Sequence, residues 1–359
     1  MSIEFLRLVK ELYRAKVVSK LMVVRYLVEK LGFSRSHAYR VVNKLVELHG
    51  MGRIVLRANY DLRSFGLSLM IIVVPRSICR KLPQDLEVPF IRSCMDSYSA
   101  SSILVLYVPR DGVERISRIL QSSDRIDTFA ILDERYYGAP DLDALKMFVE
   151  LSRTQGLVKA FVDVVTMLSG RSFDAYLCRC EEQRIELDVD LLRLARVLEL
   201  DPLMDIDEVA TKLGISRSSV RSYLESLSRS IVGIRVRRLW IHEGMDTLIV
   251  ALAKCSSNDV ENICEVLVRH PATCSVALSR QGFLATSIRS YGSYALELSQ
   301  AVRRFLNASG CEVLNLSVIP LTNLVTYSIP YVPRLEFDPV RKRWNVDALE
   351  RIVRILLAL

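Results

Sequence analysis

The chain has 359 residues, 50% of them hydrophobic, and its 49 Lys and Arg against 41 Asp and Glu give a formal charge of +8. This composition excludes a disordered chain, because enough apolar side chains are present to offset the entropy lost on folding. The longest apolar stretch, around Leu67 to Pro75, is far shorter than the roughly 20 residues of a membrane-spanning helix. The first residues mix charged and apolar side chains, unlike a secretory signal peptide. We therefore expect a soluble, cytoplasmic protein without a membrane partner.

Cysteine and histidine spacing gives no support for a metal site or a catalytic site. The eight cysteines form no C-x-x-C pair, and the four histidines show no H-x-x-x-H spacing. Cys178 and Cys180 are the closest pair, and two residues of a strand at this spacing share a face, which leaves a metal site open beside the simpler interpretation of half-buried strand cysteines. We expect no catalytic residues, no metal and no cofactor, and hence no enzyme.

The first segment, residues 1–58, predicts three short helices. Phe5 to Ala15 is amphipathic, and the apolar residues from Val24 to Leu31 recur at i, i+3, i+4 and i+7. Gly32 can end this second helix, and Ser34 is placed to cap a third one. Two helices joined to a third by a short turn that contains Gly are typical of a helix-turn-helix domain.

Residues 59–140 alternate strand and helix patterns. We expect strands near Leu67, Ile91, Ile103 and Ile126 and helices near Ser77 and Gly112. This βαββαβ order predicts a ferredoxin-like domain, in which both helices cover one face of an antiparallel sheet and something else covers the other. A helical linker, residues 141–187, follows.

The second half repeats the first. Leu31 to Ser36 (LGFSRS) recurs as Leu213 to Ser218 (LGISRS), the strand that begins near Gly66 is echoed near Gly244, and Cys94 corresponds to Cys274. The repeat predicts a second helix-turn-helix domain (188–241), a second ferredoxin-like domain (242–330) and a C-terminal helical tail (331–359). The predicted fold is α+β, with two winged-helix-like helix-turn-helix units alternating with two ferredoxin-like βαββαβ domains.

Positive charge gathers on the helix-turn-helix units. Residues 1–58 contain twelve basic and four acidic residues, so their net charge of +8 equals that of the whole chain, and residues 212–240 contain seven basic residues against Glu225. Such clustering is typical of a nucleic-acid-binding surface, although a solvated face is the simpler alternative, above all in the second copy, where the preceding helix is acidic.

The outward residues of each third helix, and the arginines that follow it, are the candidate DNA contacts. Arg and Asn can bind base edges, while Ser, the helix N-terminus and the strand arginines can contact phosphates. In the first copy the candidates are Ser34, Arg35, Ser36, His37, Tyr39, Arg40, Asn43, Lys44, Arg53 and Arg57. In the second copy they are Ser216, Arg217, Ser218, Ser219, Arg221, Ser222, Arg235, Arg237 and Arg238.

These residues, together with the segment from Asn59 to Val74, resemble the Lrp/AsnC-like (feast/famine) transcription regulators. The resemblance implies binding of double-stranded DNA, homo-oligomers that pair through their sheets, and a small-molecule effector between the sheets. Family members carry one unit per chain, so this chain with two units would act as a pseudo-dimer. The glycine of the family's effector loop is matched by Gln281 and Gly282, whereas the first copy has Ser101 and Ser102 there.

Three functions are compatible with the sequence. We expect a DNA-binding transcription regulator. The same double-unit layout also resembles the sirohaem decarboxylases, whose chemistry would need histidines and arginines in the ferredoxin-like domains. The only histidines there are His242 and His270, both in the second copy. A protein-interaction scaffold is the third alternative, favoured for the second copy by the acidic residues from Asp201 to Glu208.

Overall fold

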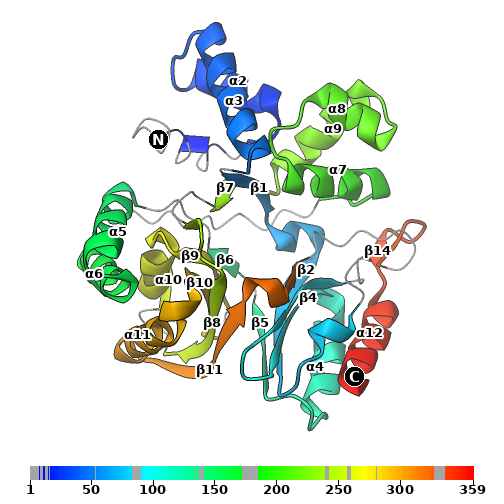
Figure 1. The fold of residues 1–359 in the computed structure, drawn as a ribbon. Helices are drawn as coiled ribbons and strands as arrows, with labels where there is room; N and C mark the ends of the chain where they lie inside the picture. The colour runs from blue at the N-terminus through cyan, green and yellow to red at the C-terminus, as the bar shows by residue number, and fades with distance from the viewer. Residues whose placement is uncertain are drawn as a thin grey trace. The chain divides into compact units, whose positions relative to one another are not determined.

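A computed structural model gives the structure of the chain (Figure 1). It describes residues 8, 11–12, 15, 17–52, 54–82, 90–132, 134–136, 141–171, 185–238, 242–256, 260–279, 281–326 and 336–359. The chain forms two compact units, and each takes segments from both copies of the repeat. Unit 1 consists of residues 1–66, 179–241 and 337–343, and unit 2 consists of residues 67–178, 242–336 and 344–359.

Unit 1 contains the first helix-turn-helix, here called the first head (residues 17–52). Helix α2 (Lys20–Glu29) buries Val23, Val24 and Leu27, and helix α3 (Arg35–Gly50) packs on it through Ala38, Val42 and Leu45. The turn between them ends as expected: Gly32 takes a φ of 69°, and the Ser34 hydroxyl accepts a hydrogen bond from the His37 amide at 3.3 Å. The helix expected over Phe5 to Ala15 falls largely outside the described residues.

The second head (residues 188–230) repeats this scaffold with helices α7 (Val189–Leu200), α8 (Ile206–Leu213) and α9 (Arg217–Ser228). Gly214 also takes a φ of 69°, and the Ser216 hydroxyl accepts from the Ser219 amide at 3.0 Å. The two turns therefore match residue by residue, with an offset of 182.

A two-stranded antiparallel ladder joins the heads. Strand β1 (Val55–Tyr60), which follows α3, pairs with β7 (Ile231–Arg238), which follows α9, and Ala58 lies opposite Ile234. Two further backbone hydrogen bonds join the two copies beside this ladder. The Ser19 amide donates to the Pro202 carbonyl at 2.7 Å, and the Asp61 amide donates to the Ser230 carbonyl at 2.8 Å. The heads thus form one body.

Unit 2 contains two five-stranded sheets. In the first sheet β2 (Leu67–Val74), β3 (Ile91–Asp96), β4 (Ser102–Pro109) and β5 (Thr128–Leu132) lie in the order β3-β4-β2-β5, and all eight residues of β2 are buried. In the second sheet β8 (Thr247–Cys255), β9 (Thr273–Leu278), β10 (Phe283–Ser290) and β11 (Cys311–Pro320) lie in the matching order β9-β10-β8-β11. The α+β class is confirmed, and this strand order is the one expected for a βαββαβ unit.

Each sheet gains its fifth strand from the other copy, which the sequence did not predict. Strand β6 (Glu134–Tyr136), which follows the first copy, pairs with β9, and β12 (Leu324–Thr326), which follows the second copy, pairs with β3. Strands β10 and β5 also come into contact. The two sheets are therefore linked both by exchanged edge strands and by packing.

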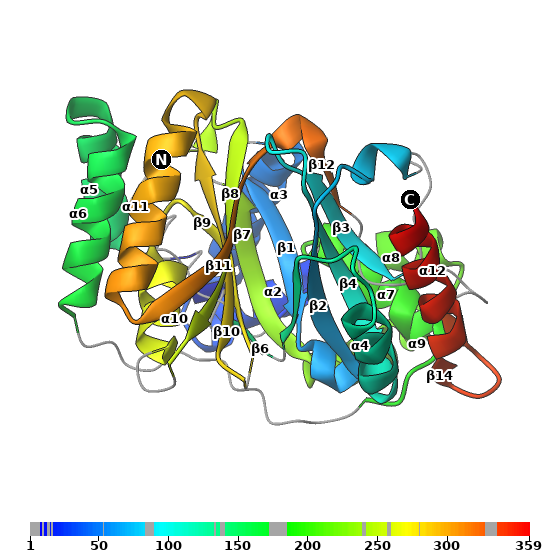
Figure 2. The same ribbon diagram turned by 90° about the horizontal axis from the view of Figure 1, so that it is seen from below.

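Helices cover the outer faces of the two sheets (Figure 2). In the second copy α10 (Val260–Arg269) and α11 (Ala295–Ala308) lie on one face, as expected, and the linker helices α5 (Leu142–Thr154) and α6 (Leu157–Ser169) pack on them through α6. In the first copy α4 (Val113–Gln121) lies beside the C-terminal helix α12 (Val346–Ala358) (Figure 2).

The structure corrects our expectation of a helix near Ser77. Among the described residues this segment holds only a single 3-10 turn, Cys79–Lys81, and residues 83–89 lie outside the description. Helix α12 covers that part of the sheet instead: Arg115 binds Asp347 at 2.7 Å, and Arg76 donates to the Leu357 carbonyl at 2.5 Å. The C-terminal tail thus completes the first copy.

Short elements complete the description. The 3-10 turns are Leu62–Phe65, Arg110–Gly112, Gly292–Tyr294 and Leu321–Asn323, and two short strands are β13 (Phe337–Asp338) and β14 (Arg343–Trp344). Two disulfides, Cys79–Cys94 and Cys255–Cys311, fall one in each copy. Within the described ranges, every helix is too short or too polar to cross a bilayer.

Candidate nucleic-acid interface and a buried carboxylate

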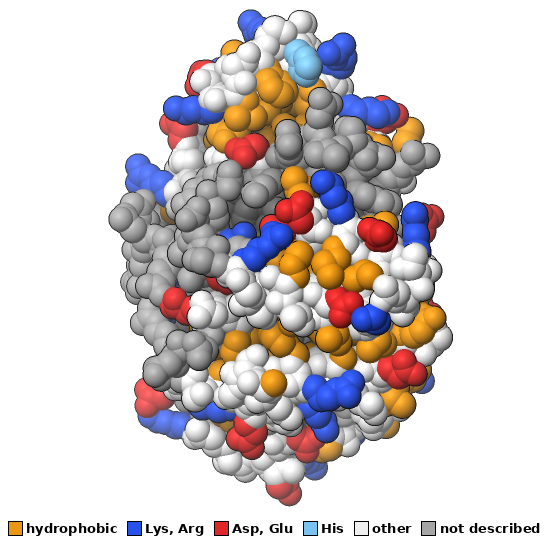
Figure 3. All heavy atoms as spheres, turned by 90° about the vertical axis from the view of Figure 1, so that its left-hand side faces the viewer, with side chains coloured by type: hydrophobic (Ala, Val, Ile, Leu, Met, Phe, Trp, Pro, Cys, Tyr) orange, Lys and Arg blue, Asp and Glu red, His pale blue; other side chains and the backbone are white. Residues whose placement is uncertain are grey.

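The candidate contacts on α3 form one exposed face of the first head. Tyr39 is half-buried, and the other α3 candidates lie in solvent beside the capping Ser34. Figure 3 shows Lys and Arg side chains and a histidine at this end of the first head. The exposed candidates are Ser34, Arg35, Ser36, His37, Arg40, Asn43 and Lys44. Sequence reasoning therefore selected a continuous polar surface around the start of α3.

Contacts within this face order part of it. Lys44 forms an ion pair with Glu47 at 2.8 Å, and the His37 ring lies edge-on to Phe33 with its Nδ1 atom 3.3 Å from a guanidinium nitrogen of Arg40. Among the described residues, Arg35 has no acidic partner within ion-pair distance. Both pairs are solvent-exposed and one helical turn apart, so they cost little to exchange for a phosphate or a base edge.

The matching face of α9 in the second head is differently charged. Arg217, Arg221 and Ser222 are exposed, but the Arg217 guanidinium forms an ion pair with Asp207 of α8 at 2.6 Å. The Ser216 hydroxyl lies 2.8 Å from the hydroxyls of both Ser218 and Ser219. The first arginine of this helix and its serines are thus already engaged within the head.

The strand arginines do not form a single surface. Arg57 of β1 is half-buried and donates to the Leu200 carbonyl at 2.9 Å, so it caps the end of α7 and ties the two heads together. Arg53 lies outside the described residues. The backbone of Arg235, Arg237 and Arg238 belongs to β7, but their side chains are outside the description.

Gly282, a candidate effector residue, has a structural reason to be glycine. It takes a φ of 81°, and a Cβ atom there would lie 2.7 Å from the Cys255 carbonyl oxygen. Its own carbonyl accepts from the Cys255 amide at 2.9 Å, and Lys254 donates to the neighbouring Gln281 carbonyl. The turn that contains Gln281 and Gly282 is therefore held against the end of β8 by close backbone packing.

The two histidines of the second copy are both enclosed. His242 is 4% exposed, and its Nε2 atom lies 2.9 Å from the Pro271 carbonyl oxygen. His270 is fully buried between Phe148 and Phe161, and its Nδ1 atom accepts from the Ala272 amide at 3.1 Å. Burial lowers the pKa of His270 to about 3. Neither imidazole is placed to exchange protons with a molecule from solvent.

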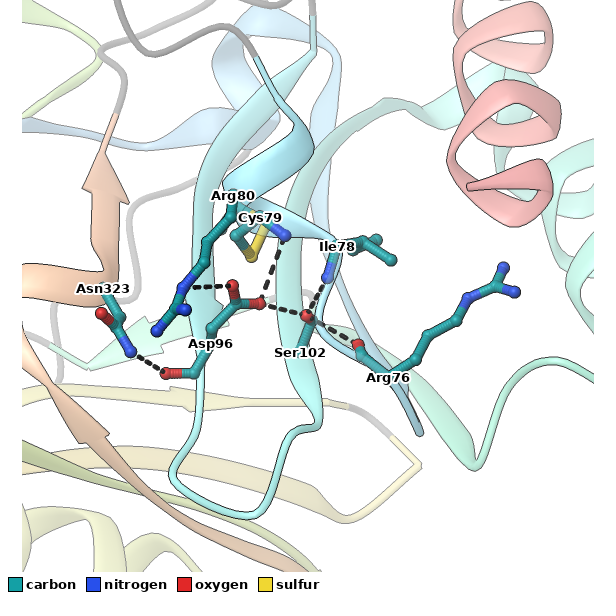
Figure 4. The surroundings of a disulfide bond; sticks show 8 residues. Arg76, Ile78, Cys79, Arg80, Asp96, Ser102 and Asn323 are labelled. Carbon is teal, nitrogen blue, oxygen red and sulfur yellow. Dashed lines mark hydrogen bonds and ion pairs between the residues drawn. A yellow bond between two sulfur atoms is a disulfide. The ribbon is translucent and has the colours of Figure 1, made fainter.

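Asp96, which sequence reasoning missed, is a buried carboxylate at the end of β3 (Figure 4). Its Oδ1 atom accepts from the Ser102 hydroxyl and from the Cys79 amide, the latter at 3.2 Å. Its Oδ2 atom accepts no hydrogen bond from the described residues and lies 4.0 Å from Nε of Arg80, a side chain that is 74% exposed. The buried carboxylate therefore lies at the limit of ion-pair distance from a solvent-facing guanidinium.

The described residues offer no metal site. Among the residues that the structure describes, no group of three or more His, Cys, Asp or Glu side chains is arranged to hold a metal ion. Cys178 and Cys180, the only closely spaced pair, lie outside that description. The polar sequence from Asp96 to Ser102 was the available signal for the Asp96 site, since an acidic residue at the end of a buried strand needs a partner.

The chain was compared with known proteins by sequence and by structure. Its sequence matches no family model and no curated protein. Its structure is similar to a solved structure of the siroheme decarboxylase NirDL, with 14% identity over 99% of this chain and 98% of that chain and a TM-score of 0.45. It is also similar to NirDL in complex with an iron-uroporphyrin III analogue, with 14% identity, coverage of 99% of both chains and a TM-score of 0.43.

This finding contradicts our expectation that the chain is not an enzyme, because the solved structures that match it along its whole length are those of an enzyme. Of our three hypotheses, the decarboxylase alternative names the kind of enzyme in these two structures. At 14% identity the likeness concerns the fold, and neither structure is of a DNA-binding regulator.

Proposed function

We propose that the first head binds double-stranded DNA with α3 in the major groove. The exposed basic and amide side chains at the start of α3 support this function. Arg35 and Arg40 have the donors that bind guanine O6 and N7, and Asn43 has the donor and acceptor that suit adenine. Lys44 and the Ser34-capped helix N-terminus suit phosphates. Regulation of transcription would follow from such binding.

A salt titration tests this proposal. Binding of the full chain to a fluorescent duplex, selected in vitro from random sequences, should weaken steeply as salt rises, because contacts to phosphates release counterions. Replacing Arg35 and Arg40 together with Ala should weaken binding by about 100-fold, since each base-contacting arginine contributes roughly 1–3 kcal/mol.

Arg118→Ala is the matched control. This arginine of α4 is 73% exposed and pairs only one turn away, with Glu114 of the same helix. Its removal changes net charge without touching the first head, so DNA affinity should stay within about twofold. Affinity that ignores salt, or an equal loss in the control, would refute specific binding by α3.

The second candidate function is catalysis on a carboxylate-bearing substrate in unit 2. The exposed Arg80 guanidinium, which lies 4.0 Å from the buried Asp96 carboxylate, supports it, because Arg binds carboxylates in two-point geometry. A tetrapyrrole such as a uroporphyrin carries several such groups. In a decarboxylation the bond to the carboxylate carbon breaks, carbon dioxide leaves, and the remaining carbon takes a proton.

Incubation with iron-uroporphyrin, followed by mass spectrometry, tests the second candidate. Loss of carbon dioxide by the porphyrin should occur with the unmodified chain, and Arg80→Ala should raise KM with little change in kcat, since Arg80 would contribute binding of the ground state and transition state alike. Asp96→Asn, a positioning variant, should raise KM less. No porphyrin product under reducing or oxidising conditions would refute this activity.

A further inference from the structure

We infer that only the first head reads DNA, so that one chain recognises a single, non-palindromic site even though it contains two helix-turn-helix units. This inference rests on the proposed DNA binding by α3. It concerns which sequence class the chain selects, because two equivalent heads would demand two half-sites related by the pseudo-symmetry of the chain.

The two heads can be compared position by position. Gly32 and Gly214 share the same φ, and Ser34 and Ser216 cap α3 and α9 in the same way. The offset of 182 that relates these pairs therefore holds through both recognition helices. At the exposed positions of α3 and α9 the chemistry differs, with Arg40, Asn43 and Lys44 replaced by Ser222, Glu225 and Ser226.

The helices that precede the two recognition helices, α2 and α8, carry opposite charges at one matched position. Asp207 of α8 forms the 2.6 Å ion pair with Arg217, and the residue at the same position of α2 is Arg25. Arg25 pairs with Glu29 within α2 at 3.6 Å. Arg35 forms no ion pair with an acidic residue among the described residues. The first arginine of the recognition helix therefore has an acidic partner in the second head and no ion-pair partner among the described residues in the first.

The net charges of the matched segments differ, and the second head lacks the positive charge that would attract it to DNA. Residues 20–50 contain six basic and two acidic residues, a net charge of +4, whereas the matched residues 202–232 contain four of each, a net charge of zero. Phosphates line both edges of the major groove, so Glu225 on the face of α9 would meet like charge there.

Buried residues explain why the second head keeps its scaffold without this surface. Val220, Leu224 and Leu227 of α9 fill the head, and the β1–β7 ladder joins it to the first head. Arg57 of β1, the strand that follows the first head, caps α7 of the second by donating to the Leu200 carbonyl. The second head therefore supports the first one structurally. This role requires its core and its ladder, but it does not require DNA-binding side chains on the exposed face of α9.

Two matched double variants of the full chain test the inference against the duplex selected by the unmodified chain. Replacing Arg35 and Arg40 with Ala should weaken binding by about 100-fold. Replacing Arg217 and Arg221 with Ala should change affinity by less than about twofold, and the slope of log affinity against log salt should stay the same, because no phosphate contact is lost. All four side chains are exposed, and unchanged circular dichroism will verify the fold.

The outcomes separate the inference from the proposed function. Equal losses in the two double variants, or a palindromic consensus protected by one chain, would overturn the inference and leave DNA binding intact. Failure of the unmodified chain to bind any selected duplex would overturn both. A single, non-repeated sequence motif in the selected duplexes, together with the unequal losses, is the supporting result.

Discussion

The two copies of the repeat share buried residues and differ in exposed ones. In the heads, capping serines, turn glycines and core leucines occur at matched positions, while the net charge of the matched segments 20–50 and 202–232 changes from +4 to zero. Since burial determines whether a helix-turn-helix folds, and exposure determines what it binds, a duplicated unit can keep its fold and lose its ligand. The comparison teaches that similarity between the copies is evidence about scaffold and gives no evidence that both heads bind.

The two sheets of unit 2 differ in the opposite way, in their cores. In the second copy α10 covers the sheet and ends at Arg269, directly before His270. The described residues of the first copy hold only the Cys79–Lys81 turn at the matching place, and α12 from the C-terminus packs there. Phe90 occupies the position that corresponds to His270 at the offset of 180 between Cys94 and Cys274. The second copy thus buries a titratable group where the first buries a hydrocarbon ring.

The largest expected effect concerns His270. The pKa of its imidazole is about 3 in the folded chain and near its ordinary 6.5 in the unfolded chain. The unfolded chain therefore takes up a proton first as pH falls, so the stability due to neutral His270 is complete above pH 6.5 and is lost as pH falls toward 3. The difference of 3.5 pKa units corresponds to about 5 kcal/mol.

Urea unfolding at pH 7, 5 and 4 measures this loss. His270→Phe, which installs the residue of the first copy, should remove the His270 contribution, so the variant should lose less stability than the unmodified chain on acidification. At pH 7 it should be slightly less stable, by about 1 kcal/mol, because the Ala272 amide loses its acceptor. Parallel pH profiles would show that acid sensitivity arises elsewhere.

The next largest effect compares the disulfides. Cys255–Cys311 closes a loop with a sequence separation of 56, and Cys79–Cys94 closes one of 15. Loss of each cross-link frees the unfolded chain, at a cost of about 4 kcal/mol for the long loop and about 3 kcal/mol for the short one. Replacing each pair with Ser and measuring unfolding under oxidising conditions should show the second copy to be the more dependent one.

The same measurement with reductant provides the control. A reducing agent should lower the stability of the unmodified chain and have little effect on a variant that lacks all four of these cysteines. If the Cys79–Cys94 variant were the less stable of the two, the length of the closed loop would not govern the difference, and packing around Cys79 and Cys94 would have to explain it.

Much of the fold could be predicted because its signals are local. Gly32 before Ser34, and Gly214 before Ser216, predicted the turns, and the alternating patterns predicted eight strands of the two sheets. The exchange of β6 and β12 and the cover by α12 could not be predicted, since such pairings depend on which distant segment reaches an exposed edge or face first. The sequence carries no local pattern for that choice.

In the candidate site, too, the features that depend on local sequence could be predicted and the contacts between distant residues could not. The exposed face of α3 followed from helical periodicity, and the structure places those side chains in solvent as expected. Arg57 was expected on a phosphate, but its partner, the Leu200 carbonyl, lies 143 residues away in sequence. The charge reversal between Arg25 and Asp207 was readable from the repeat, since extending the LGFSRS alignment by six residues toward the N-terminus pairs these two positions.

The smallest expected effect is a gain of binding in the second head. Asp207→Arg restores the charge that the first head has at this position and releases Arg217 from its ion pair, and Glu225→Asn removes the acid from the face of α9. Together they should tighten binding to a duplex that carries two copies of the selected site by about tenfold, or roughly 1.4 kcal/mol, and should add about two to the salt slope. Fluorescence anisotropy across salt concentrations measures both.

The control is a duplex with one copy of the site, which the double variant and the unmodified chain should bind within about threefold of each other, because the first head already occupies it. Asp124→Arg, an exposed substitution in unit 2 that adds two positive charges where the double variant adds three, should not distinguish the two duplexes. If the double variant gains nothing on either duplex, the two acids do not silence the second head, and the difference between the heads must lie in the serines that replace Arg40 and Lys44.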